Sequence, residues 1–161
     1  MRRQYAVGSR QKEMLPSAYC WTSGQRPAWG AKMKKADILL VDDETVFTTN
    51  MSKLLTSRGY QVTTVKNGQE ALATLKDKPF DVMVLDLKMP VMDGITTLQQ
   101  MKPLGLLTEV LILTGHGSMD TAFQAIEMGA YDYVTKPCEI AELVSKIEAA
   151  HARKKVREKK A

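Results

Sequence analysis

The chain has 161 residues, which suits one domain with tails, and 44% of them are hydrophobic, enough for one core. Its longest apolar runs have the length of strands, which argues against a transmembrane helix. The net charge of +5 comes from the two ends of the chain. Residues 1–32 and 151–161 each hold six Lys or Arg and one acid, whereas residues 33–150 hold eleven Lys or Arg and sixteen acids. An acidic body with basic ends makes a nucleic-acid partner unfavoured.

Residues 1–32 show neither strand nor helix periodicity, and we expect a disordered leader there. The favoured explanation is a natural start at Met33, which would make the leader non-native; a docking tail is the alternative. Apolar strands then alternate with amphipathic helices. Strands are predicted at 38–41, 61–65, 82–86, 110–113 and 131–135, and helices at 45–58, 68–77, 94–103, 118–129 and from 139 on, with 151–161 as a basic, frayed extension of the last helix.

Five strand–helix repeats predict an α/β fold, a doubly wound five-stranded parallel sheet of order 2-1-3-4-5 with five helices, as in flavodoxin. We place this domain at residues 33–150. A doubly wound sheet has its site at the carboxyl ends of the strands where the order reverses. Those are the ends of the first and third strands, which carry Asp42, Asp43 and Asp86.

Three carboxylates at one edge of the sheet repel one another, and a hard divalent cation relieves that repulsion. Mg²⁺ fits best, and Mn²⁺ can substitute. Asp43 and Asp86 can ligate it directly, Asp42 can hold a ligating water, and the Lys88 carbonyl can add an oxygen. The alternative for the acids at 42–44 is simple capping of the following helix.

The other strand ends supply groups that phosphoryl transfer needs. The Lys136 ammonium can pair with Asp86 and with a phosphoryl oxygen, and the Thr114 hydroxyl can donate to another oxygen. Gly115 leaves space beside them. Together they indicate Asp86 as a nucleophile that becomes an acyl phosphate. Lys136 as an ordinary surface lysine is the alternative.

These residues resemble the receiver domain of bacterial two-component response regulators, over about residues 33–151. Each motif alone is weak, but their order and separations are specific. The matching motifs are Val41-Asp42-Asp43-Glu44, Asp86-Leu87-Lys88-Met89-Pro90 with Asp93-Gly94, Thr114-Gly115-His116-Gly117 and Tyr133-Val134-Thr135-Lys136-Pro137.

The resemblance implies that Asp86 accepts phosphate from a phosphohistidine, supplied by a sensor histidine kinase or a phosphotransfer protein. It implies magnesium held by Asp43, Asp86 and the Lys88 carbonyl, with Asp42 assisting. It also implies a cis peptide bond before Pro137.

The family further implies a switch. Thr114 would move toward the phosphoryl group and Tyr133 would turn inward, reshaping the face of helix four, strand five and helix five, through which a phosphorylation-dependent homodimer could form. Lys88, Gly115 and His116 are candidates for tuning the lifetime of the phosphate. For His116, a phosphorelay role is the less favoured alternative.

We therefore expect a stand-alone cytoplasmic receiver, a switch rather than a turnover enzyme, whose output is a protein contact. The main rival is a truncated or short DNA-binding transcriptional regulator that uses the basic tails. Two enzymes of related fold are also rivals. A haloacid-dehalogenase-like phosphatase needs an Asp where Lys88 stands, and a flavodoxin needs a Ser/Thr-rich loop where this chain has acids.

Overall fold

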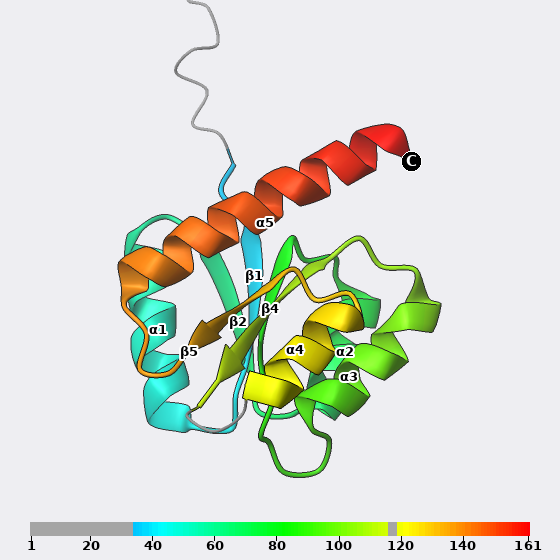
Figure 1. Ribbon diagram of the computed structural model, residues 1–161. Helices are drawn as coiled ribbons and strands as arrows, with labels where there is room; N and C mark the ends of the chain where they lie inside the picture. Colours follow the sequence, from blue (N-terminus) through cyan, green and yellow to red (C-terminus); the bar gives the residue numbers. More distant parts are fainter. Residues whose placement is uncertain (1–33, 116–118) are drawn as a thin grey trace, which may run out of the picture. The chain divides into compact units, whose positions relative to one another are not determined.

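The computed structural model describes residues 34–115 and 119–161, which form a five-stranded parallel sheet covered by helices (Figure 1). The strands are β1 (Asp37–Val41), β2 (Gln61–Val65), β3 (Val82–Asp86), β4 (Glu109–Thr114) and β5 (Asp132–Thr135). The helices are α1 (Thr45–Ser57), α2 (Gly68–Asp77), α3 (Gly94–Met101), the 3₁₀ turn η3 (Lys102–Leu104), α4 (Met119–Glu127) and α5 (Ile140–Lys160). The order β2-β1-β3-β4-β5 confirms the predicted fold.

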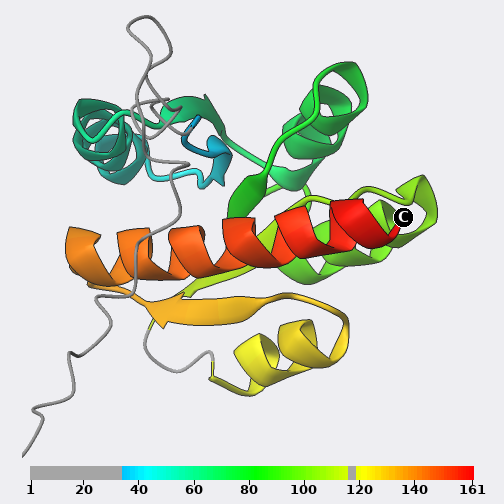
Figure 2. The ribbon, with the colours of Figure 1, turned by 90° about the horizontal axis from the view of Figure 1, so that it is seen from above.

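The sheet has a separate hydrophobic cluster on each face because successive strand residues point to opposite sides. Ile38 and Leu40 of β1 face α1 and α5, whereas Leu39 and Val41 face α2, α3 and α4. Figures 1 and 2 show these two helical layers. All five residues of β1 and of β3 are buried, so the strands that carry the acids are the rigid centre of the domain.

Side-chain caps begin two of the helices, α2 and α3. The Asn67 side chain accepts a hydrogen bond from the amide of Glu70 at 2.9 Å, at the start of α2. Asp93 accepts one from the amide of Thr96 at 2.7 Å, at the start of α3. Each cap satisfies an otherwise unpaired amide of the first turn. Asp93 is thus the capping residue of α3.

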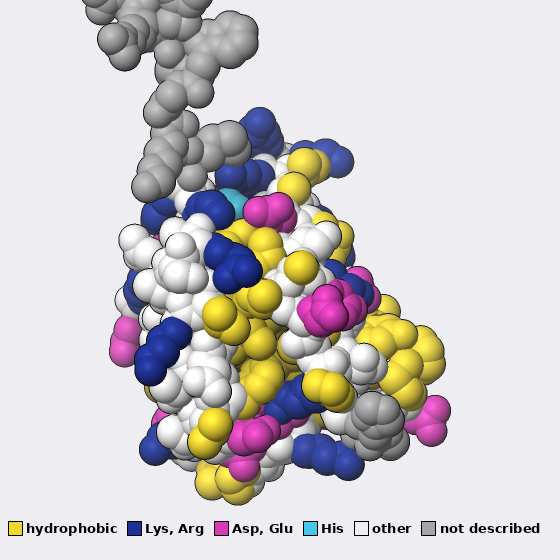
Figure 3. Space-filling model, turned by 90° about the vertical axis from the view of Figure 1, so that its left-hand side faces the viewer, with side chains coloured by type: hydrophobic (Ala, Val, Ile, Leu, Met, Phe, Trp, Pro, Cys, Tyr) yellow, Lys and Arg dark blue, Asp and Glu magenta, His cyan; other side chains and the backbone are white. Residues whose placement is uncertain are grey.

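The last helix differs from the prediction that its charged end frays: α5 is continuous to Lys160. Lys154 is 8% exposed and pairs with Asp81 at 2.6 Å, and Arg157 pairs with Glu109 at 2.7 Å. The fraying prediction was wrong because two acids at the amino edge of the sheet hold the basic residues. Figure 3 shows the side on which α1 and α5 lie, with Lys and Arg gathered near its upper end.

Two further expectations concern the chain outside the sheet. The Lys136-Pro137 peptide bond is cis, as the resemblance implies. None of the helices within residues 34–115 and 119–161 combines the length and the apolar character needed to span a bilayer. The predicted leader at residues 1–32 lies outside the described residues.

Candidate functional site: a carboxylate cluster at the carboxyl edge of the sheet

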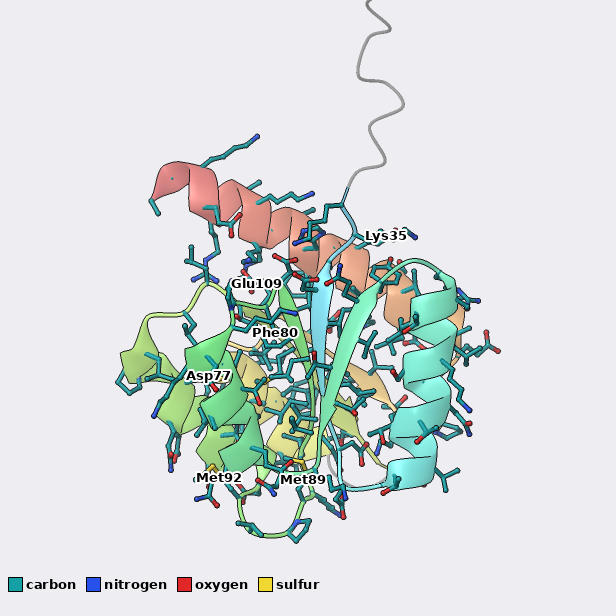
Figure 4. All side chains as sticks on the ribbon, turned by 180° about the vertical axis from the view of Figure 1, so that it is seen from behind. Lys35, Asp77, Phe80, Met89, Met92 and Glu109 are labelled. Atoms are coloured by element: carbon teal, nitrogen blue, oxygen red, sulfur yellow. The ribbon has the colours of Figure 1, made fainter. Side chains whose placement is uncertain are left out.

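Asp42, Asp43 and Asp86 converge where β1 and β3 end. Oxygens of the three carboxylates lie within 4.8 Å of one another. Asp42 and Asp86 are buried, with 1% and 7% of their surface exposed, and Asp43 is exposed. In Figure 4 this edge lies beside the labelled Met89 and Met92, and Glu109 marks the opposite edge. The parallel order of the sheet therefore brings together acids that are 43 residues apart in sequence.

Both carboxylate oxygens of Asp42 already have partners. Oδ1 accepts a hydrogen bond from the amide of Glu44 at 2.9 Å, and Oδ2 accepts one from the Lys136 ammonium at 2.5 Å. Such bonds orient the carboxylate firmly. The direction of the Asp42 carboxylate is thus set by the Glu44 amide and the Lys136 ammonium; its expected role in holding a ligating water stays a prediction.

The Lys136 ammonium enters the site from the end of β5, with 19% of its side chain exposed. Its closest partner is Asp42, whereas Asp86 Oδ2 lies 3.9 Å away and Glu44 Oε2 lies 3.8 Å away. Burial alone lowers the pKa of Lys136, but the hydrogen bond to Asp42 and the charges of Asp86 and Glu44 outweigh it and raise the pKa. Lys136 therefore remains a cation at the site.

The side-chain carboxyl group of Asp86 has a pKa above its ordinary value. Burial of its side chain, together with the neighbouring carboxylates of Asp42 and Asp43, raises its pKa to about 6, despite the lowering effects of the Lys136 ammonium and of a hydrogen bond from the Lys88 amide. Ionisation of Asp86 therefore costs more free energy in the protein than it does for a carboxyl group in water. A cation at the site would lower this pKa.

The loop after β3 lines a hollow of about 500 Å³ beside the acids. Its walls come from Asp43, Leu87, Lys88, Met89, Pro90, Asp93 and, from α4, Thr121. At Gly94 the chain passes so close to β3 that an added Cβ would lie 2.6 Å from the Asp86 carbonyl oxygen. The loop is therefore held tightly against the strand that ends on Asp86.

Val91, in the same loop, has a φ of +68° and is 79% exposed. The amide of Met92 donates a hydrogen bond to the Pro90 carbonyl at 2.8 Å, which closes a three-residue turn around Val91. A β-branched residue is strained in this conformation.

The end of β4 contributes Thr114, which is fully buried. Its Oγ1 donates to the Gly115 carbonyl at 3.3 Å, and its own carbonyl accepts from the Lys136 amide at 2.7 Å. Among residues 34–115 and 119–161, a Cβ added at Gly115 would meet no heavy atom within 4 Å. His116 lies outside the described residues.

Tyr133 lies on β5 and is half-buried. Its ring meets that of Phe123 edge-on at 6.0 Å, and the Lys146 ammonium lies 5.5 Å from its centroid. Lys146 also donates to Asp132 at 2.6 Å and to the Tyr133 carbonyl at 2.8 Å. These contacts join α4, β5 and α5 into one surface, here called the α4–β5–α5 face.

One residue beside the site was missed by sequence reasoning. Phe47 lies in the helix predicted at 45–58 and was given no role at the site, yet the Lys136 ammonium lies 4.6 Å from its ring centroid. An aromatic residue in a helical stripe gives no sign of a cationic neighbour, because that neighbour comes from 89 residues further along the chain.

The donor set fits Mg²⁺. The cluster offers oxygens of three carboxylates, and the charges of Asp42 and Asp43 help to raise the pKa of Asp86, a repulsion that a cation would relieve. The adjoining hollow of about 500 Å³ has room for water and phosphate oxygens. Within residues 34–115 and 119–161 it is the single group of three potential metal ligands of this type.

In a comparison with protein families, residues 38–148 match the response regulator receiver domain. The chain is 40% identical over 118 residues to the transcriptional regulatory protein ZraR of Salmonella typhimurium and 36% identical over 118 residues to the DNA-binding transcriptional regulator NtrC of Escherichia coli. These alignments cover 73% of this chain in both cases, but 27% and 25% of the relatives. The chain thus spans about a quarter of the length of these curated relatives.

Solved structures of response regulators are also similar to this chain. The crystal structure of a response regulator receiver domain protein from Clostridium thermocellum has a TM-score of 0.71 and 36% sequence identity, covering 75% of this chain and 98% of that one. Full-length FixJ from B. japonicum has a TM-score of 0.74 and 34% identity, covering 78% of this chain and 62% of that one.

Proposed function

This chain belongs to the family of response regulator receiver domains, and we propose that it accepts a phosphoryl group on Asp86 and thereby switches a protein-binding surface. The observation that carries the proposal is the convergence of Asp42, Asp43, Asp86 and Lys136 at one edge of the sheet. Family membership implies phosphoryl acceptance in two-component signalling. The named residues, the donor and the output are our assignments.

In the proposed step an Asp86 oxygen attacks the phosphorus of a phosphohistidine. A new O–P bond forms, the N–P bond breaks, and the imidazole nitrogen leaves with its electron pair and takes up a proton. The donor is a sensor histidine kinase or a phosphotransfer protein. Asp86 must be ionised to attack, which its pKa of about 6 allows at neutral pH.

The chain's own residues stabilise the added charge. Lys136, 3.9 Å from Asp86, moves from Asp42 to a phosphoryl oxygen, and the Thr114 hydroxyl turns from the Gly115 carbonyl to another. Asp43, Asp86 and the Lys88 carbonyl would hold Mg²⁺, with Asp42 orienting a ligating water. Bound Mg²⁺ would neutralise the acids and the transferring oxygens.

We propose that the signal leaves through the α4–β5–α5 face. Thr114 and Tyr133 lie on neighbouring strands, since Thr114 pairs with Thr135 and Ile112 with Tyr133. A shift of Thr114 would thus displace the neighbouring part of β5. Tyr133 would then turn inward and change its contact with Phe123. The output is a protein contact, of which a homodimer through this face is one form. Lys88, Gly115 and His116 would set how long the phosphate lasts.

We assign the domain to residues 33–150, with 1–32 outside it and 151–161 as an extension of α5, and we place it in the cytoplasm, where kinase domains present their phosphohistidine. As a receiver it is a switch modified once per signal, not a turnover enzyme.

The ZraR and NtrC relatives are regulators of transcription by name; a DNA-binding output for this chain is the alternative. The pairing of Lys154 and Arg157 with acids leaves less free positive charge for it.

The test is phosphorylation with acetyl phosphate, or its mimic beryllofluoride, in the presence of Mg²⁺. The wild-type protein is expected to gain one phosphoryl group by mass and to show a change at the α4–β5–α5 face by NMR, with sedimentation reporting any dimer. Asp86→Asn should abolish labelling, and Lys136→Ala should uncouple binding from response.

Asp93→Asn is the matched control, because Asp93 lines the same hollow but caps α3. Labelling of Asp86→Asn at the wild-type rate would contradict the proposal. Specific DNA binding that depends on Asp86 would favour the alternative.

A further inference from the structure

The Lys136 ammonium lies close to three acidic side chains and to one aromatic ring. Its ammonium lies 2.5 Å from Asp42, 3.8 Å from Glu44 and 3.9 Å from Asp86. The ring of Phe47 has its centroid 4.6 Å from the same nitrogen. The ring belongs to the first turn of α1 and the ammonium to the loop after β5, so the contact joins two elements that the sheet order separates.

The function proposed above requires Lys136 to change partners while staying in place. A lysine ammonium ends a flexible four-carbon stem, so its position is set by what surrounds it. The acids cannot fix it throughout, because phosphorylation of Asp86 changes one of them and a cation at the site would compete for the others. The face of a ring attracts a cation without taking up one of its hydrogen bonds.

We propose that Phe47 is a positioning residue that holds the Lys136 ammonium beside Asp86 while Lys136 exchanges Asp42 for a phosphoryl oxygen. This inference rests on the proposed function. Phe47 touches neither phosphate nor metal; it acts through Lys136. Its half-buried ring packs against the cluster between the sheet, α1 and α5, which fixes the ring in position.

The alternative is that Phe47 is a core residue whose ring meets Lys136 by accident. A core role needs apolar volume, which Leu also supplies, whereas holding an ammonium needs the negative face of an aromatic ring. The two roles therefore differ in their response to Phe47→Leu, Phe47→Tyr and ring fluorination.

The first measurement needs neither phosphate nor magnesium. In the metal-free protein the Lys136 Hε protons are expected upfield of the same protons in Phe47→Leu, because they lie near the ring. Phe47→Tyr should keep the upfield position. Equal shifts in the wild-type protein and Phe47→Leu would overturn the inference at the level of geometry.

The second measurement is the rate of phosphorylation by acetyl phosphate across a magnesium titration. Phe47→Leu is expected to lower the maximal rate by about threefold to tenfold, in the range for a cation on a ring face, with the half-saturating magnesium concentration unchanged within about twofold. Phe47→Tyr should restore the rate. Fluorinated phenylalanines at position 47 should lower it stepwise, since each fluorine weakens the ring's negative face.

Val46→Ala is the control, because Val46 is the neighbouring apolar residue on α1 and is 72% exposed. A wild-type protein that is not labelled on Asp86 would overturn the proposed function. A labelled wild-type protein with Phe47→Leu equally fast, or with a rate insensitive to fluorination, would overturn the role of Phe47 alone.

Discussion

At the scale of single residues, Asp86 should make the metal-free fold less stable. Its folded-state pKa of about 6 lies above the ordinary value of 3.8, so the folded state binds more protons between these pH values. Stability should therefore fall as pH rises through this window. Asp86→Asn removes the buried charge and should be more stable than the wild-type protein at pH 7, by on the order of 2 kcal/mol, with the difference shrinking toward pH 4.

Urea unfolding in EDTA at several pH values measures this difference. Asp120→Asn, which removes an exposed acid on α4, is the control and should change little at any pH. An advantage of Asp86→Asn that stays constant from pH 4 to 7 would disprove the assigned cause.

Val91 is a second residue at which the chain is expected to be under strain. Its φ of +68° suits Gly or Asn, and its 79% exposed side chain packs little. Val91→Asn should stabilise the protein by about 1 kcal/mol through relief of this strain. Thermal unfolding would show it, and Val91→Thr, which keeps the β-branch, should show no gain. A less stable Val91→Asn would mean that the turn is not strained.

At the scale of elements, the amino edge of the sheet anchors the second half of α5. Glu109 is 1% exposed and pairs with Arg157 at 2.7 Å and Arg153 at 3.6 Å. Arg157→Ala would leave a buried carboxylate with one distant partner and should cost about 1–3 kcal/mol. Hydrogen exchange at residues 151–160 should increase.

Two variants separate this anchor from a general effect on the helix. Lys159→Ala, at an exposed position of α5, should stay within about 0.5 kcal/mol of wild type. The double variant Glu109→Gln/Arg157→Ala should regain part of the loss, because its buried group carries no charge. A loss in Arg157→Ala no larger than in Lys159→Ala would count against the anchor.

At the scale of the whole molecule, occupation of the carboxylate cluster should stabilise the folded chain. A ligand that binds the folded state alone adds about 2.7 kcal/mol at a hundred times its dissociation constant. Mg²⁺ should therefore raise the melting temperature by several degrees, and EDTA should reverse the rise. Asp43→Asn should lose most of it, because Asp43 is the exposed acid of the cluster. An equal rise in melting temperature for the wild-type protein and Asp43→Asn would mean that Mg²⁺ binds elsewhere.

The sequence by itself determined the alternation of strands and helices, the parallel sheet and the edge at which the acids meet. These follow from local causes: apolar runs that end on Asp42 and Asp86, amphipathic helices between the strands, and the rule that parallel strands share their carboxyl edge. The family motifs indicated which kind of site lies at that edge.

The tertiary structure alone decided how these groups pair. Lys136 bonds to Asp42 more closely than to Asp86, and Phe47 lies beside it. Charged residues of α5 that read as a fraying tail are held by Asp81 and Glu109. The physical reason is the same in each case: electrostatic contacts depend on distances of a few ångströms between residues far apart in sequence, and periodicity carries no record of those distances.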